Sequence, residues 1–162
     1  MRLPPFQTLL DAHGRAVYRF LIAIVGPVDA DDCYQETWLA AVRAYPELDA
    51  ASNLRGWLFT IARHKAIDHI RSRARRATLV ADPAELAGTG ASALPAQSAA
   101  IADSDLWTAV AVLPDKQRTA LALRFIADAP YADIATAMQT SEPAARRNVH
   151  EALKRLRQEH VR

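Results

Sequence analysis

The sequence has few of the residues that mark secreted, membrane-spanning or catalytic proteins. Cys33 is the single cysteine among 162 residues, so no intrachain disulfide can form, and its place on the apolar side of a predicted helix favours core packing. The chain contains no apolar run of about eighteen residues, the length of a membrane-spanning helix. Its first residues, MRLPPFQTLL, lack the pattern of a signal peptide. These absences predict a cytoplasmic protein that does not insert into a membrane.

Groups for catalysis and metal binding are missing as well. The sequence contains neither a glycine-rich phosphate loop nor a credible pair of nucleophile and base. His64 and His69 are five residues apart, a poor pairing on a helix face. Asp29, Asp31 and Asp32 crowd the start of a predicted helix without the spacing of a calcium-binding loop. We therefore expect no enzyme activity, no catalytic residue, no metal site and no cofactor.

Charge is small in total but uneven along the chain. The net charge is +2 overall. Residues 1–76 hold eleven bases and eight acids, residues 77–103 hold three acids and no base, and residues 104–162 hold nine bases and seven acids. Two mildly basic blocks on either side of an acidic connector suit two separate contacts with a polyanion.

Helical periodicity dominates residues 1–76. Apolar residues recur at three-and-four spacing, which predicts three helices, at residues 6–25, from about 29 or 30 to 45, and from 57 to 76. Asp29 is a suitable cap for the second helix, and the polar residues 46–53 form a loop. Three amphipathic helices can share one core, with Trp38 and Trp57 as its largest members.

The segment from Trp57 to Arg76, WLFTIARHKAIDHIRSRARR, joins an apolar stripe to a basic face. Between residues 63 and 76, six bases stand against the single acid Asp68, a net charge of +5. This surface suits phosphate binding. A solvated basic helix end, whose cations complement the helix dipole, would have the same composition. The stripe consists of Trp57, Leu58, Ile61, Ala62, Ala66, Ile67 and Ile70.

The composition changes to Ala, Gly, Ser, Thr and Pro over residues 77–103, which predicts a flexible linker. Helical patterns return in residues 104–162. A short turn at Gln139 and Thr140 joins the last two helices, and Ser141 can cap the final one, as in a helix-turn-helix. The predicted fold class is all-α, with two small helical domains joined by a flexible linker. The four helices are expected at residues 104–113, 114 to about 127, 131–138 and 141 to about 160.

Three segments in order carry a resemblance to a known family: DADDCYQETWLAAVRAY at 29–45, the basic segment at 57–76, and LPDKQRTALALRF with YADIATAMQTSEPAARRNVHEALKRLR within 113–157. Together they resemble a bacterial RNA polymerase sigma factor of the extracytoplasmic-function (ECF) group. The resemblance implies that residues 1–76 form a domain that binds core RNA polymerase and the minus-ten promoter element. It implies that residues 104–162 form a domain that binds the minus-thirty-five element, and that an anti-sigma factor regulates the protein.

The resemblance places core-polymerase binding on the helix near residue 32. Asp32 and Glu36 are four residues apart and therefore share a helical face, with Gln35 beside them. An exposed row of acids and an amide suits a basic partner helix, although ordinary surface charge would give the same pattern. The expected residues are Asp31, Asp32, Gln35 and Glu36.

The resemblance also implies two sets of DNA-binding residues. For the minus-ten element they are Asn53 and Arg55 near the bases, with Arg63, His64, Lys65, Arg71 and Arg73 near phosphates. For the minus-thirty-five element they are Glu142, Ala145, Arg146 and Asn148 at base edges, with Arg147, Lys154, Arg155 and Arg157 at phosphates. The sequence departs from the family at His64, where asparagine is usual, at Leu54, where an aromatic is common, and at Gln139, where glycine is usual.

One alternative is a helix-turn-helix regulator that binds DNA without acting as a sigma factor. Such a regulator needs neither the DADDCYQETW helix nor the basic helix that begins at Trp57. A helical enzyme is the weakest alternative, because the sequence lacks the required groups.

Overall fold

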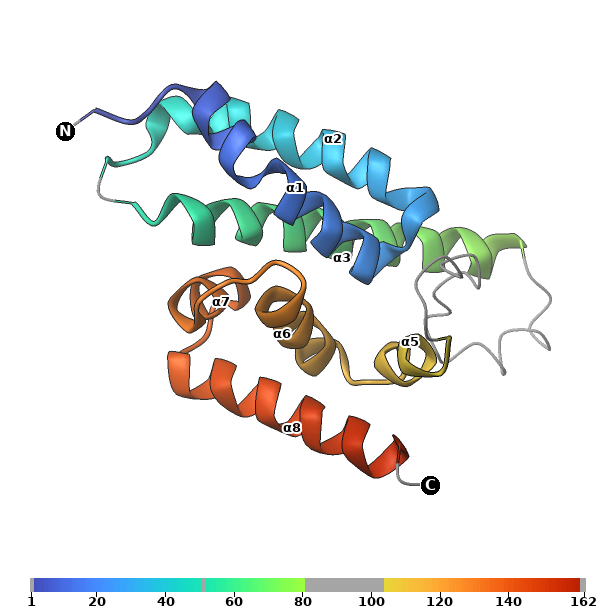
Figure 1. Cartoon of the computed structure of the whole chain (residues 1–162). Helices are drawn as coiled ribbons and strands as arrows, with labels where there is room; N and C mark the ends of the chain where they lie inside the picture. The colour runs from blue at the N-terminus through green and yellow to red at the C-terminus, as the bar shows by residue number, and fades with distance from the viewer. Residues whose placement is uncertain (1, 51, 81–103, 161–162) are drawn as a thin grey trace.

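The computed structural model describes residues 2–50, 52–80 and 104–160, and within these ranges it is helical without strands. This confirms the all-α prediction. Helices α1, α2 and α3 form one layer, and α5 to α8 form a second unit beneath it (Figure 1). The elements are α1 Phe6–Val25, α2 Pro27–Ala44, the 3-10 turn η1 Tyr45–Glu47, α3 Leu54–Val80, α5 Ser104–Ala111, α6 Asp115–Phe125, α7 Tyr131–Met138 and α8 Glu142–His160.

Helix α2 begins at Pro27, two or three residues earlier than expected. Gly26 has a φ of 86°, a conformation that favours glycine, and Pro27 follows as the first helical residue. Asp29 is therefore in the first turn of α2 and is not its cap. Its carboxylate instead contacts α3, where it accepts a hydrogen bond from Arg73 Nη1 at 2.8 Å.

Helix α3 is longer at both ends than the sequence pattern predicted. Asn53 caps it, because its Oδ1 accepts a hydrogen bond from the Gly56 amide at 3.1 Å. The helix continues to Val80, so residues 77–80, which we assigned to the linker, are helical. No glycine or proline interrupts this end. The rest of the expected linker, residues 81–103, lies outside the described residues.

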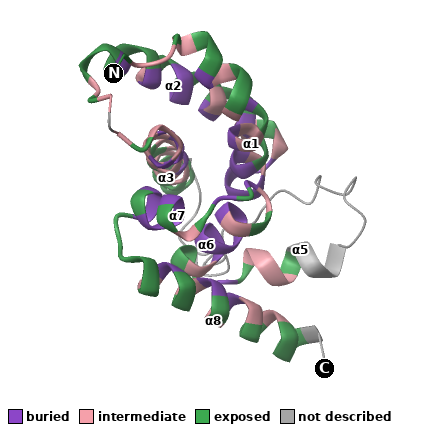
Figure 2. Ribbon diagram, turned by 60° about the vertical axis from the view of Figure 1, so that its left-hand side comes forward, coloured by how far each residue is buried: buried purple, intermediate pink, exposed green. Residues whose placement is uncertain are grey.

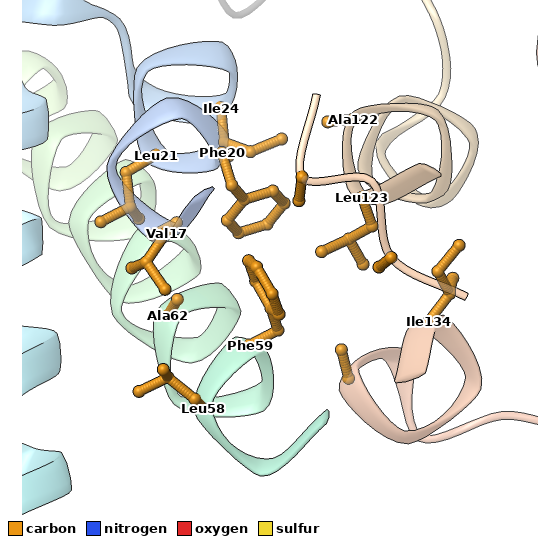
Figure 3. Packing of buried hydrophobic residues seen from close by; sticks show 14 of the residues in the cluster. Val17, Phe20, Leu21, Ile24, Leu58, Phe59, Ala62, Ala122, Leu123 and Ile134 are labelled. Atoms are coloured by element: carbon orange, nitrogen blue, oxygen red, sulfur yellow. The ribbon is translucent and has the colours of Figure 1, made fainter. Parts of the chain in front are cut away.

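One hydrophobic core joins the two helical units. Phe20 of α1, Phe59 of α3 and Leu123 of α6 are each fully buried and belong to the same cluster, with Ile134 of α7 (Figure 3). The rings of Phe20 and Phe59 pack edge to face with centroids 5.8 Å apart. Phe59 is absent from the stripe that the sequence predicted, and it is buried in this shared cluster. Trp57, expected in the core, is only partly buried.

The carboxy-terminal helices have the expected turn. Gln139 adopts the left-handed conformation, with a φ of 54°, at the position where glycine would be easiest to accommodate. Ser141 Oγ then accepts a hydrogen bond from the Ala144 amide at 3.2 Å, so Ser141 caps α8 as predicted. Pro114 precedes α6 as its cap instead of being its first residue. In the described part of the chain, no helix has the length and apolarity needed to span a membrane.

Candidate polymerase and nucleic-acid interfaces

A groove of about 490 Å³ runs between α2 and α3. Asp32, Gln35 and Glu36 line its α2 side, and all three are exposed, as the sequence predicted. Leu39 continues this side with 53% of its surface exposed. The opposite side comes from Asp68, His69, Ser72, Arg75 and Arg76 of α3. The groove thus joins an acidic and amide wall, one exposed apolar side chain and a basic edge.

Asp31 does not belong to this groove, although the sequence grouped it with Asp32. A hydrogen bond to Asp31 raises the pKa of Tyr18, which places the Asp31 carboxylate against α1. Successive residues on a helix point about a quarter-turn apart, so neighbouring acids face different partners. Cys33 of α2 is 1% exposed, and burial raises the pKa of its thiol to about 12.

The basic face of α3 is accessible along most of its length. His64, Arg71 and Arg73 are exposed, whereas Arg63 and Lys65 are half-buried. Burial lowers the pKa of Arg63. Arg73 keeps 56% of its side chain exposed while it pairs with Asp29. A single exposed pair of this kind leaves the guanidinium available to a phosphate.

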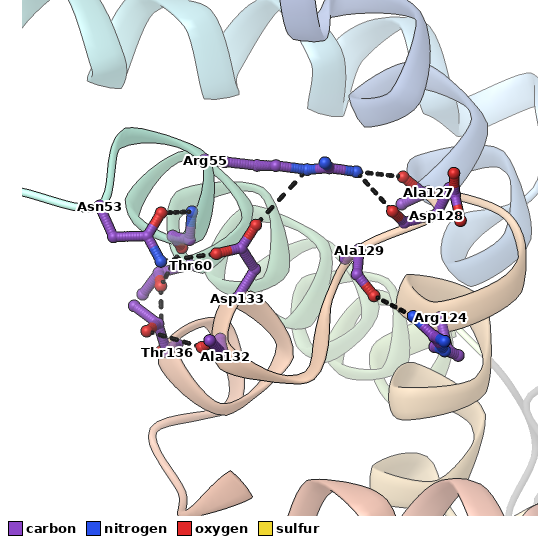
Figure 4. A network of polar contacts seen from close by, with 11 residues as sticks. Asn53, Arg55, Thr60, Arg124, Ala127, Asp128, Ala129, Ala132, Asp133 and Thr136 are labelled. Carbon is purple, nitrogen blue, oxygen red and sulfur yellow. Dashed lines mark hydrogen bonds and ion pairs between the residues drawn. The ribbon is translucent and has the colours of Figure 1, made fainter.

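Asn53 and Arg55, expected near promoter bases, are engaged by the second helical unit (Figure 4). Asn53 Nδ2 donates to Asp133 Oδ1 at 2.6 Å. Arg55 Nη2 donates to the carbonyl oxygens of Ala127 and Asp128, at 2.7 and 2.8 Å. Arg55 Nε lies 3.6 Å from Asp133 Oδ2, an ion pair. The sequence offered no signal for Asp133, because the contact joins residues 80 positions apart.

The backbones of α3 and α7 come close together beside these contacts. A Cβ atom placed on Gly56 would lie 2.9 Å from Cβ of Thr136, so the approach requires glycine. Thr60 Oγ1 donates to the Gly56 carbonyl at 2.7 Å and to the Thr136 carbonyl at 3.2 Å. Residues at the start of α3 therefore contact α7 through side chains and through the backbone.

Helix α8 turns most of its predicted DNA-binding residues toward solvent (Figure 2). Exposed among them are Glu142, Arg146, Arg147, Lys154, Arg155 and Arg157. Asn148 is half-buried, and its Nδ2 donates to the Ala144 carbonyl at 3.1 Å. The prediction for Ala145 is wrong, because this residue is fully buried in the core and cannot reach a base edge.

Tyr131 organises the start of α8, which the sequence analysis missed. The guanidinium carbons of Arg146 and Arg124 lie 4.3 and 4.7 Å from the centre of the Tyr131 ring. Glu142 Oε2 is 4.0 Å from Arg146 Nη2. The Arg146 side chain is thus held by an aromatic face and a carboxylate at the amino-terminal end of the helix.

Within residues 2–50, 52–80 and 104–160, no three His, Cys, Asp or Glu side chains are grouped as metal ligands.

Each of the two helical units matches the model of a known protein family. The model of sigma-70 region 2 matches residues 9–76, and the model of sigma-70 region 4 matches residues 104–156. The ECF RNA polymerase sigma factor SigL of Mycobacterium tuberculosis is 31% identical over 155 residues, covering 93% of this chain and 86% of SigL. The chain belongs to the sigma-70 family.

Further relatives place this sigma factor in the ECF group. SigC of M. tuberculosis is 36% identical over 131 residues, covering 80% of this chain and 69% of SigC. SigX of Bacillus subtilis is 28% identical over 158 residues, covering 94% of this chain and 81% of SigX. A plain helix-turn-helix regulator is not favoured, since region 2 matches nearly all of the first unit.

Two solved structures have the same fold. The sigma factor RpoE of Bartonella quintana, crystallised with the anti-sigma factor NepR, superposes with a TM-score of 0.76 at 25% identity and 96% coverage of both chains. CnrH, solved with the cytosolic domain of CnrY, gives a TM-score of 0.66 at 22% identity, covering 93% of this chain and 84% of CnrH.

Proposed function

We propose that this ECF sigma factor binds core RNA polymerase through the α2–α3 groove and directs initiation at promoters through α3 and α8. The observation that carries this proposal is the ordered pair of region 2 and region 4 matches on helices that expose acidic and basic faces separately. In this proposal the protein has no enzymatic activity of its own and works in the cytoplasm, where RNA polymerase transcribes.

The first helical unit would hold both the polymerase and the opened strand. The acidic and amide row of Asp32, Gln35 and Glu36 suits a basic partner helix, and exposed Leu39 adds apolar contact area within the same groove. Asp31, turned toward Tyr18, would contribute less. The residues that we propose to contact the minus-ten element are Asn53, Arg55, Arg63, His64, Lys65, Arg71 and Arg73.

The second unit would read the minus-thirty-five element with α8 in the major groove. Arg146 suits guanine, because a guanidinium can form two bonds with one base edge, and Glu142 and Asn148 lie on the same helix start. Arg147, Lys154, Arg155 and Arg157 supply exposed cations for phosphates. We also propose an anti-sigma factor as regulator, because the matching RpoE structure was solved with the anti-sigma factor NepR.

Reversal of one charge in the groove tests the polymerase contact. Glu36→Lys places a cation in the acidic wall and should weaken binding to core RNA polymerase by about tenfold or more, because it opposes a basic partner. Glu47→Lys, an equal charge change on exposed η1 outside the groove, is the matched control. Affinity is measured by fluorescence anisotropy with labelled protein and purified core enzyme. Equal affinities for both variants would rule out this groove as the docking site.

A further inference from the structure

We propose that Tyr131 is a positioning residue for base recognition, because its ring holds the Arg146 guanidinium in the orientation that reads the upstream element. The guanidinium carbon of Arg146 lies over the Tyr131 ring, 4.3 Å from its centre. The proposal rests on the proposed function, in which Arg146 contacts a base edge. It adds that base preference depends on a residue of α7 that acts through Arg146.

Arg146 needs a restraint because most of its side chain is in solvent. The side chain is 60% exposed, and a free arginine side chain loses many rotamers when it binds. Glu142 Oε2 lies 4.0 Å from Arg146 Nη2, but exposed ion pairs of this kind restrain a side chain weakly. The face of an aromatic ring attracts a guanidinium at this distance and favours one placement of it. The ring is therefore the principal restraint on Arg146.

The Tyr131 ring belongs to a fixed part of the fold. Tyr131 is the first residue of α7, and it packs, partly buried, against the hydrophobic core. Pro130 precedes it as the cap of α7 with a φ of −66°, the value that the proline ring imposes. The backbone that carries the ring is thus restricted before the helix begins, and the ring can serve as a platform for a mobile side chain.

Arg124 of α6 contacts the same ring. Its guanidinium carbon lies 4.7 Å from the centre of the Tyr131 ring. Its Nη1 also donates to the Ala129 carbonyl at 3.2 Å, and Ala129 is fully buried (Figure 4). Helices α6, α7 and α8 therefore contribute one side chain each to a single stack of Arg124, Tyr131 and Arg146. Packing of these helices sets the position from which Arg146 starts.

Loss of the ring should alter base preference more than overall attraction to DNA. A guanidinium distinguishes guanine only when two of its nitrogens meet the base edge together, which requires a defined orientation. Phosphate contacts carry no sequence information. Arg147 and Lys154 are exposed on the same helix and keep their charge when Tyr131 is changed. A positioning residue therefore has a distinct signature, a loss of discrimination at one base position.

Holoenzyme transcription from a library of upstream elements measures this signature. The reference position is the base pair at which Arg146→Ala relaxes the preference. Tyr131→Leu keeps apolar bulk but removes the ring, and should lower the preference ratio there by about two- to fivefold, the effect of an exposed cation–π contact. The ratios at other positions should not change. Tyr131→Phe keeps the ring and should keep the preference.

Two further measurements separate positioning from a general structural effect. The double variant Tyr131→Leu with Arg146→Ala should discriminate no worse at the reference position than Arg146→Ala alone, because the ring acts through Arg146. In NMR spectra of the free full chain, the ring should shift the Arg146 δ-protons upfield. This shift should persist in Tyr131→Phe and vanish in Tyr131→Leu. Circular dichroism checks that each variant keeps its helices.

The outcomes distinguish this role from the proposed function. An unchanged preference in Tyr131→Leu, or an equal loss at every position, would overturn the positioning role. An equal loss in Tyr131→Phe and Tyr131→Leu would also overturn it, because the hydroxyl would then contact DNA directly. An Arg146→Ala variant that relaxes no position would instead refute base reading by Arg146 in the proposed function, and the positioning role with it, even where NMR shows the contact with the ring.

Discussion

Arg146 shows how the structure refines the choice of residues that we propose to read bases. Its guanidinium lies on the Tyr131 ring and beside Glu142, at the amino-terminal end of α8. Lys154 is exposed two turns further along the helix. Ala145, one position before Arg146, is fully buried. Spacing along the sequence placed all three on one candidate helix, but only the packing separates a solvent-facing position from a core position.

The two cations should therefore affect DNA binding differently. Arg146→Ala should cost about 1–3 kcal/mol at one base position and relax preference there, whereas Lys154→Ala should weaken binding to all sequences alike. Binding of the holoenzyme to a library of upstream elements, measured at two salt concentrations, distinguishes the effects. Uniform losses across the library for both variants would contradict the assigned roles.

At the scale of single elements, local signals predicted most helix positions. The run from Phe6 to Val25 and the helix Tyr131–Met138 were predicted with their observed bounds, because Gly26 and Pro130 interrupt the periodicity beside them. The predicted helix bounds are wrong at the start of α2 and at the end of α3, where two local signals disagree. Asp29 resembled a cap but contacts Arg73, and residues 77–80 lack a helix breaker and extend α3.

The Ser141 cap gives a test at this scale. Ser141→Ala leaves the Ala144 amide without its side-chain acceptor and should lower the free energy of unfolding by about 1 kcal/mol. Ser141→Asp keeps an acceptor at the helix start and should restore most of the loss. Urea unfolding followed by circular dichroism measures both. A serine-to-alanine variant as stable as the unchanged chain would show that the cap contributes nothing.

At the scale of the whole molecule, the sequence predicted two units but not their contact. Periodicity describes one helix at a time, so it could not reveal why Phe59, outside the predicted stripe, is fully buried. It also left Asp133 unnoticed, since its partners Asn53 and Arg55 lie in the other unit. The α2–α3 groove, which we propose as the polymerase contact, was predictable in part, because Asp32 and Glu36 share a helical face by spacing alone.

At this scale, stability should also depend on pH through His13 of α1, which interacts electrostatically with Arg55 of α3 and Asp133 of α7. Burial, and then the charge of Arg55, lower the pKa of His13 below its ordinary value of 6.5, while Asp133 opposes this shift. The unfolded chain therefore binds the proton more readily, so stability is lost as the pH falls below about 6.5. His13→Gln should lose less stability between pH 7.5 and 5.5 in urea unfolding. Equal losses in both proteins would exclude this contribution.

Transcription reconstituted from purified components tests the central claim most directly. Core RNA polymerase is incubated with the protein and a library of random upstream sequences, and the 5′ ends of the transcripts are sequenced. We predict transcripts that require the protein and start at fixed distances from two shared upstream elements. A saturating amount of protein that yields no transcripts beyond those of core enzyme alone would contradict the assignment of this chain as a sigma factor.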